Sequence, residues 1–352
     1  MALFNDPVYR QNLAQVAGLP IDWALLQGRS FMISGATGMI GSFLVDLIAY
    51  KNETDGLDCT VYALGRNEHK AQQRFSAFWQ QPWFQFICCD INTQIPEMAN
   101  TVDFILHAAS NTHPVAYATD PIGTVTTNII GTYRLLEYAA NHSTSRFVFA
   151  STVEIYGENR AEIEAFSEED CGYIDCNTLR AGYPESKRAG EALCQAYIQQ
   201  KGMDIVIPRL SRVYGPTMLM SDTKALSQFI KNSLAGEDIV LKSAGNQFFS
   251  YSYVADAVTG ILYCLTKGQC GQAYNIADPA SDITLRDLAQ LIANNTGTKV
   301  VFQIPDAVES AGFSKATKAI LDSSKLRALG WRPQWDIHAG IFQTIQILKS
   351  RA

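Results

Sequence analysis

The sequence predicts an α/β fold with a doubly wound parallel sheet and a smaller C-terminal lobe. Short apolar runs rich in β-branched and aromatic residues alternate with longer segments of helical periodicity as far as Asp278. Continuous apolar strands separated by helices are typical of a parallel sheet that is covered on both faces. A glycine-rich turn follows the first apolar run, and the alternation becomes irregular after Arg209, before the last predicted strand.

Seven runs are expected to form the strands of this sheet, and most are separated by segments with the period of a helix. In chain order they are SFMISGAT (30–37), CTVYALG (59–65), FQFICCDI (84–91), VDFILHAAS (102–110), RFVFAST (146–152), MDIVIPRLS (203–211) and QAYNIAD (272–278).

Beyond these strands, proline, glycine and other loop residues cluster in VYGPTMLMSDTK and LKSAGNQFFSYS. Such clusters interrupt regular elements, which indicates a second unit built from discontinuous segments. We expect a dinucleotide-binding domain of residues 1–210 and 252–280, and a substrate-binding lobe of residues 211–251 and 281–352.

Composition and charge exclude several classes of protein. The chain of 352 residues carries a net charge of −6 and has no run of lysine or arginine, so a nucleic-acid surface is not expected. It has neither a signal-peptide pattern at the N-terminus nor an apolar run of about 18 residues, and a cytoplasmic protein with no membrane partner is expected. The eight cysteines lack the spacing of a zinc site or of a disulfide framework, so no metal is expected.

The glycine-rich turn predicts a dinucleotide site in a Rossmann-like domain. Its glycines follow the spacing G-x-x-G-x-x-G between the first strand and an amphipathic helix. Glycines allow a tight turn and a close approach to a pyrophosphate, whose charge meets the free amides at the helix N-terminus. The residues of this turn expected to contact the cofactor are Gly35, Thr37, Gly38, Met39, Ile40 and Gly41.

The end of the second strand leaves the cofactor open between NAD and NADP. An acidic residue there would bind the ribose hydroxyls of NAD, but the strand ends in Gly65-Arg66-Asn67. Arg66 is suited to a 2′-phosphate, or it lies on the adenine face without contacting a phosphate. Asp90 and Ile91 end the third strand and are expected near the adenine edge, although Asp90 is equally explained as a strand-terminating residue.

Tyr183 and Lys187 are the candidate proton-transfer pair. They are four residues apart, and therefore lie on one face of a helix. An unperturbed tyrosine has a pKa of about 10, but an adjacent ammonium and a cationic nicotinamide both favour phenolate. The pair could then take a proton from a substrate alcohol. The spacing also arises often by chance on solvated helices.

In combination, the glycine turn, Ser151-Thr152 at a strand end and the Tyr-x-x-x-Lys pattern resemble the extended short-chain dehydrogenase/reductase superfamily. The resemblance is to its branch of nucleotide-sugar epimerases, dehydratases and decarboxylases, and runs from about Arg29 to about Trp335. Further matching segments are HAAS, TNIIGTYRLLE, RLSRVYGP, YSYVADAV and DSSKLRALGWRP.

The resemblance implies a role for each matching residue. Tyr183 is the catalytic acid/base, Lys187 lowers its pKa and holds the nicotinamide ribose, Thr152 hydrogen-bonds the reacting hydroxyl, and Asn128 supports the lysine through water. The strand-end residues implied to lie along the cofactor are Ala108, Ala109, Ser110 and Ser151. A homodimer is also implied, through a four-helix contact that Leu193 and Tyr197 would allow.

Glu154 and Val153 bear on the reaction. Dehydratases that resemble this protein carry a glutamate at the position of Glu154 as the base at C5 of the sugar, and simple 4-epimerases usually lack it. Val153 cannot protonate a departing C6 hydroxyl, whereas loss of carbon dioxide needs no such donor. We therefore rank a hexuronate decarboxylase above a dehydratase, and both above an epimerase. An NADP-dependent carbonyl reductase and a non-catalytic nucleotide sensor remain alternatives, and Glu154 could instead be a supporting or capping carboxylate.

The chain departs from its relatives where they hold a diphosphate. Arg212 stands where they usually have asparagine, while Phe249 and Ala319 stand where they have arginine. Arg212, or more weakly Lys318, is expected to replace one of these two arginines. An interdomain salt bridge of Arg212 and a different kind of substrate are the alternatives, and Arg209 is expected to be structural. The residues expected to contact the substrate are Ser110, Thr152, Arg212 and Lys318.

Overall fold

The computed structural model describes residues 2–98, 100–112, 114–160, 162–303 and 317–351. Its main sheet is parallel and confirms the expected fold class. Across the sheet the strands run in the order β11 (Ala273–Ile276), β7 (Ile205–Leu210), β5 (Arg146–Phe149), β4 (Phe104–His107), β1 (Ser30–Ser34), β2 (Thr60–Gly65) and β3 (Phe84–Cys88). The short strand β6 (Ser151–Thr152) continues β5 and pairs with β7.

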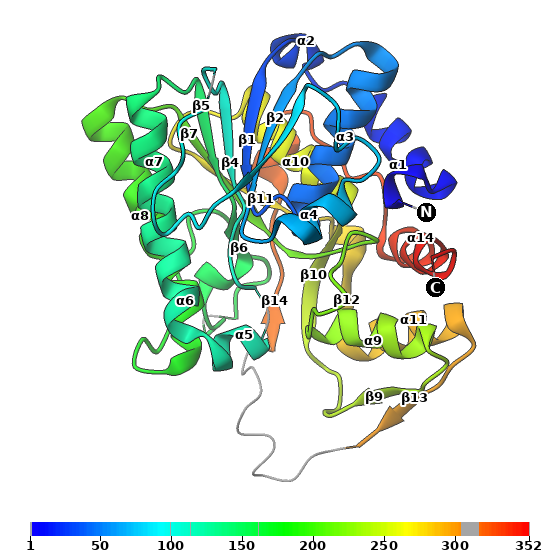
Figure 1. Ribbon diagram of the computed structural model, residues 1–352. Coiled ribbons are helices and arrows are strands. Elements are labelled where there is room, and N and C mark those ends of the chain that lie inside the picture. Colours follow the sequence, from blue (N-terminus) through cyan, green and yellow to red (C-terminus); the bar gives the residue numbers. More distant parts are fainter. Residues whose placement is uncertain (1, 99, 113, 161, 304–316, 352) are drawn as a thin grey trace.

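Helices cover both faces of this sheet (Figure 1). On one face lie α7 (Thr132–Asn141) and α8 (Gly182–Lys201), and on the other α3 (Met39–Asp55) and α10 (Val254–Lys267). Successive residues of a strand point to opposite faces; accordingly Met32 packs in the core on the α7–α8 side, and Phe31 and Ile33 pack in the core on the α3–α10 side. Two apolar faces account for strands that are hydrophobic at every position.

Short elements surround the sheet. They are η1 (Leu3–Asn5), α1 (Pro7–Ala17), α2 (Trp23–Leu26), α4 (Glu68–Arg74), α5 (Pro114–Thr119), α6 (Pro121–Thr126), η2 (Thr127–Gly131), η3 (Val153–Tyr156) and η4 (Leu179–Ala181). Helix α1 packs against α3, α10 and the last helix of the chain, α14 (Ile337–Lys349).

A second unit is built around β10 (Phe248–Tyr253), which pairs with β8 (Arg212–Tyr214), β12 (Asp282–Thr284) and β14 (Lys318–Ala319). Its other elements are α9 (Ala225–Leu234), β9 (Ile239–Leu241), η5 (Pro279–Ser281), α11 (Leu285–Thr296), β13 (Val300–Phe302) and α14 (Ile337–Lys349). Helix α13 (Ser324–Ala328) instead packs against β11 of the main sheet and against α10. The exact domain bounds stay a prediction. The main-chain amides of Gln334 and Trp335 nevertheless donate to Asp256 on α10, which ties the last part of the chain to the main sheet.

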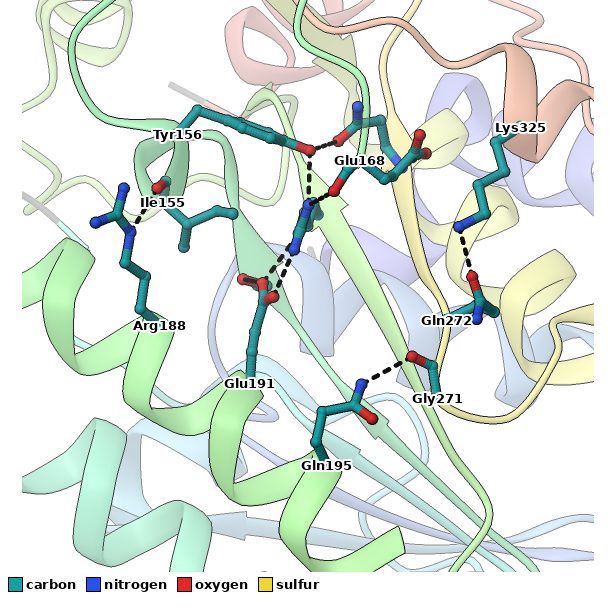
Figure 2. A network of polar contacts seen from close by, with 12 residues as sticks. Ile155, Tyr156, Glu168, Arg188, Glu191, Gln195, Gly271, Gln272 and Lys325 are labelled. Atoms are coloured by element: carbon teal, nitrogen blue, oxygen red, sulfur yellow. Dashed lines mark hydrogen bonds and ion pairs between the residues drawn. The ribbon is translucent and has the colours of Figure 1, made fainter. Parts of the chain in front are cut away.

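A polar network around Arg209 connects α8, the strand ends and the second unit (Figure 2). Arg209 pairs with Glu191 of α8 at 2.7 Å and donates to the Tyr156 hydroxyl at 3.0 Å. Tyr156 donates to Asn275 at 2.7 Å, and Asn275 donates to the carbonyl of Asp322. The network fixes the segment after β6, and Arg209 has the structural role expected of it.

Within the described part of the chain, no helix is long and apolar enough to cross a bilayer. The same residues contain no group of three or more histidine, cysteine, aspartate or glutamate side chains placed to bind a metal. All eight cysteines are free thiols.

Candidate active site

The glycine turn after β1 forms an anion site at the N-terminus of α3. Gly38 is the N-cap of this helix and provides no side-chain cap, so the first amides stay open to a ligand. Gly35 has φ of 70°, and a Cβ there would lie 2.8 Å from the carbonyl oxygen of Ala108 and from Cα of Ala109. A Cβ on Gly41 would lie 2.5 Å from the carbonyl oxygen of Gly35. The turn is thus packed closely against the chain leaving β4, as a pyrophosphate site requires.

A buried histidine holds the chain that crosses this turn. The ring of His107 lies between the hydroxyls of Ser34 at 2.7 Å and Thr132 at 3.0 Å, and Ser34 also accepts from the amide of Ala109 at 3.3 Å. Burial and the charge of Lys187 hold the pKa of His107 well below its usual range, so the ring is neutral. His107 is part of the HAAS segment, but its role as a support for Ala108 and Ala109 has no signal in the sequence.

Asn128 lies in η2, a turn of π-helix inserted between α6 and α7. Its Nδ2 donates to the hydroxyl of Ser186 at 2.9 Å, whereas its buried Oδ1 has no hydrogen-bond partner among the described residues. A buried amide oxygen without a partner is costly, and π-turns are frequent at functional sites. The open acceptor fits a role for Asn128 toward water beside the cofactor.

Tyr183 is buried at the start of α8. Its ring stacks on that of Tyr117 from α5, with centroids 5.1 Å apart and planes at 29°. Burial raises the pKa of Tyr183 and the charge of Glu154 raises it further, whereas a hydrogen bond with Thr152 and the charge of Arg180 lower it. Thr152 is therefore in contact with the tyrosine, and its expected hydrogen bond to the reacting hydroxyl stays a prediction.

Lys187 lies one helical turn after Tyr183 and is buried. Its Nζ donates to the carbonyl of Ala150 at 2.8 Å and lies 4.8 Å from the ring centroid of Phe149. Burial lowers the pKa of Lys187 to about 8, against the opposing effect of Glu191. The groups that lower the pKa of Tyr183 are thus Thr152 and Arg180, and the expected contribution of Lys187 stays a prediction.

Glu154 follows Thr152 in η3 and faces Arg180 of η4. The Nη2 group of Arg180 donates to both carboxylate oxygens, each at 2.8 Å. The Thr152 hydroxyl caps η3 by accepting from the amide of Glu154, and Val153 is buried in the core. Arg180 and Tyr117 were missed from the sequence: Arg180 precedes Tyr183 by three residues, but no local pattern connects it with Glu154.

Arg212 lies over Phe249, one of the two positions where an arginine expected from the resemblance is missing. Its Cζ lies 3.5 Å from the ring centroid of Phe249, and Phe249 pairs in register with Ala319 across β10 and β14. Nη1 of Arg212 is buried without a hydrogen-bond partner among the described residues. Burial lowers the pKa of Arg212, while Tyr251 and Glu154 raise it. Lys318 is half-buried beside Phe248.

The remaining predicted positions lie at the carboxyl edge of the sheet with varied contacts. Arg66 is exposed directly after β2. Asp90 accepts from the amide of Asn92 in a local turn, and Ile91 is buried. The hydroxyl of Ser110 donates to the carbonyl of Asn111, and that of Ser151 donates to Glu191. Half-buried Thr37 lies in the turn itself, whereas Met39 and Ile40, also half-buried, are the first two residues of α3. None of these contacts settles their expected roles.

Comparisons with known proteins test the expected family. Residues 31–277 match the model of the NAD dependent epimerase/dehydratase family. The chain is 30% identical over 320 residues to UDP-glucuronic acid decarboxylase 1 of Danio rerio, covering 90% of this chain and 72% of that protein. These matches confirm the expected family and its enzymatic class. They also confirm NAD as the cofactor, and the NADP alternative raised by Arg66 is minor.

Solved structures share the fold. A dTDP-glucose 4,6-dehydratase of Streptomyces venezuelae with NAD bound has a TM-score of 0.76 at 23% identity, covering 91% of this chain and 96% of that chain. UDP-glucuronic acid 4-epimerase of Bacillus cereus, in complex with UDP-glucuronic acid and NAD, has a TM-score of 0.75 at 23% identity, covering 92% and 100%. The glycine turn and the open acceptor of Asn128 fit a bound NAD.

Proposed function

The chain belongs to the NAD dependent epimerase/dehydratase family and is a nucleotide-sugar modifying enzyme, and within that class we propose that it decarboxylates a nucleotide-linked hexuronate. The observation that carries the proposal is the set of charges around Tyr183. The guanidinium groups of Arg180 and Arg212 and the carboxylate of Glu154 act on one another across the site. Two positive charges face one negative charge, an arrangement that suits a substrate with more than one anionic group.

The proposed first step is oxidation of the C4 hydroxyl. A bound NAD would supply the redox chemistry, as acceptor of a hydride from C4 and donor of the same hydride later in the cycle. Tyr183, as phenolate, takes the proton of the hydroxyl, and Thr152 orients that hydroxyl by a hydrogen bond. Lys187, held over the sheet by Ala150, would bind the ribose of the cofactor, with Asn128 and its open oxygen supporting it through water.

The second step acts on the resulting ketone. In a 4-keto hexuronate the C6 carboxylate is β to the ketone, so the C5–C6 bond breaks and its electron pair passes into the enolate as carbon dioxide leaves. C5 of the enolate then takes a proton, which we assign to Glu154 as the relay from solvent. Reduction at C4 and return of the proton from Tyr183 complete the cycle. Val153 is buried and apolar, so this position supplies no acid for a departing C6 hydroxyl.

We propose that Arg212 binds the diphosphate of the substrate. Its guanidinium stacks on Phe249, beside the position of Ala319, and therefore places one cation where the relatives have two. The partnerless, buried Nη1 is a donor available for a phosphate oxygen. Lys318 and Ser110 are proposed to contribute weaker contacts.

The proposal is tested by incubating the purified enzyme with UDP-glucuronate, UDP-glucose and dTDP-glucose and by weighing the products by mass spectrometry. Loss of carbon dioxide from UDP-glucuronate supports it. Loss of water from a hexose, or an isomer of unchanged mass, would instead identify a dehydratase or a 4-epimerase. Denaturation of the same preparation should release NAD, since an internal cycle of oxidation and reduction regenerates it.

A homodimer remains a proposal. Ile130 and Tyr133 expose apolar surface beside α8, and the Tyr133 ring contacts Tyr197 edge-on at 6.5 Å. Tyr197 itself is buried and donates to Glu137. An apolar surface on the α7–α8 side supports a four-helix contact between two copies.

A further inference from the structure

Arg180 contacts Glu154 directly and Tyr183 through the ring of Tyr117. It lies in η4, immediately before the helix that carries Tyr183, and its Nη2 group reaches both oxygens of Glu154. The Arg180 side chain is 47% exposed and that of Glu154 is 27% exposed. The contribution of such a partly exposed ion pair to stability is small though measurable, so stability alone does not explain its geometry.

The same guanidinium contacts the aromatic partner of the catalytic tyrosine. Cζ of Arg180 lies 4.9 Å from the ring centroid of Tyr117, and Tyr117 stacks on Tyr183. Both rings line a cavity of about 250 Å³, together with Leu179 and Ala181. The two rings therefore lack packing partners on the side that faces the cavity. The contact with Arg180 restrains the Tyr117 ring instead.

We infer that Arg180 is a positioning residue of the active site, which holds the Glu154 carboxylate by hydrogen bonds and fixes the Tyr183 ring through Tyr117. The inference rests on the proposed function, because it assigns to Arg180 the placement of the two groups that transfer protons in that reaction.

The position of Arg180 also affects the ionisation of Tyr183. Charged or titratable groups lie near this tyrosine on several elements: Glu154 of η3, Arg180 of η4 and the stacked Tyr117 of α5. On its own helix, Glu185 lines the same cavity, and Lys187 is directed to the carbonyl of Ala150. Of those that act on it, Arg180 lowers the pKa of Tyr183, whereas burial and Glu154 raise it. Removal of Arg180 would leave the raising effects unopposed by this cation.

The experiment compares R180M and R180K with the wild type, using the NAD-loaded enzyme and UDP-glucuronate. We expect R180M to move the limb of the pH profile of kcat/KM that reports Tyr183 to higher pH, by about one unit. R180K, which retains the positive charge, should restore part of the shift. The matched control is R160M, because Arg160 likewise pairs with a glutamate, Glu158, and stacks on a tyrosine, Tyr173, at 3.6 Å. A profile of R180M equal to that of the wild type, or an equal shift in R160M, overturns the inference.

A second measurement does not depend on turnover. R180M, E154Q and the double variant are unfolded by heat, and the shift of the midpoint caused by R180M should be at least halved in the E154Q background. Equal shifts in both backgrounds would show that the two side chains are not coupled, which also overturns the inference. If the wild type turns over no nucleotide sugar, the proposed function fails. The comparison of the two single variants with the double variant still decides whether Arg180 holds Glu154.

Discussion

Cζ of Arg212 on β8 lies 3.5 Å from the ring centroid of Phe249 on β10. These two strands pair in parallel. Phe249 in turn stands beside Ala319 on β14. The positive charge of Arg212 on β8 thus lies close to two uncharged positions, Phe249 on β10 and Ala319 on β14. The aromatic face stabilises the charge by a cation–π contact and leaves the edge of the guanidinium available for an anion.

Replacement of this cation should weaken binding of the nucleotide sugar. We expect R212M to raise KM for the substrate about tenfold, because a charge-assisted hydrogen bond to phosphate is lost. Retention of NAD should be unchanged. K318M is the comparison, and an effect of K318M larger than that of R212M would transfer the role to Lys318. Steady-state kinetics and isothermal titration with UDP provide the measurements.

The carboxylate of Glu154 should be needed for the second step but not for oxidation at C4. With E154Q we expect a 4-keto sugar and reduced cofactor to accumulate, visible as nicotinamide absorbance and by trapping with borodeuteride. The control is E158Q, which removes a carboxylate from the exposed ion pair with Arg160. Unchanged turnover of E154Q would remove this residue from the mechanism.

The phenol of Tyr183 is expected to carry the proton transfer. Y183F should lower kcat about 10³-fold, within the range for loss of a general acid–base group. Binding of NAD should be retained, as measured by dinucleotide release on denaturation, because the ring still stacks on Tyr117. A Y183F enzyme with more than a tenth of the normal rate would require another base.

The burial of Lys187 predicts a particular dependence of stability on pH. Its pKa is lowered to about 8 in the folded protein, against about 10.4 when unfolded. Between these values the unfolded chain binds more protons, so the free energy of unfolding rises with pH, by about 3 kcal/mol in total. Denaturant unfolding of wild type and K187M from pH 7.5 to 10.5 isolates this contribution as their difference. A difference that falls over this range would contradict the burial of an ammonium.

The close packing of the phosphate turn should distinguish two glycines with similar backbone angles. Gly35 has φ of 70° and Gly28 has φ of 68°, but a Cβ at Gly28 would meet nothing within 4 Å. G28A should therefore cost about 1 kcal/mol of stability, the strain of a left-handed alanine. G35A should cost more and should also abolish tight NAD retention. Thermal unfolding and dinucleotide release measure the two effects, and equal losses in both variants would rule out the clash with Ala108 and Ala109.

The alternation of apolar runs and helical periods was sufficient to predict the parallel sheet, because each strand is buried on both faces and each helix on one. Spacing singled out the glycine turn and the pair Tyr183 and Lys187, because these signals lie within one turn or one helix, but it acquired meaning only in combination with the other matching segments. The family and the enzymatic class followed from these patterns taken together, whereas the end of the second strand left NAD and NADP open until the comparisons decided for NAD. The individual roles of most site residues remain predictions.

Only the tertiary structure brought together residues that are distant in the chain. Ser34 and His107 are 73 residues apart, and Glu154 and Arg180 are 26 apart; neither pair has a periodic signal. Arg212 was singled out from the sequence as a replacement for missing cations, but its place over Phe249 depends on the register of β8 and β10. The physical reason is that local sequence determines which face of an element is apolar, whereas strand order and register determine which polar side chains meet at the sheet edge.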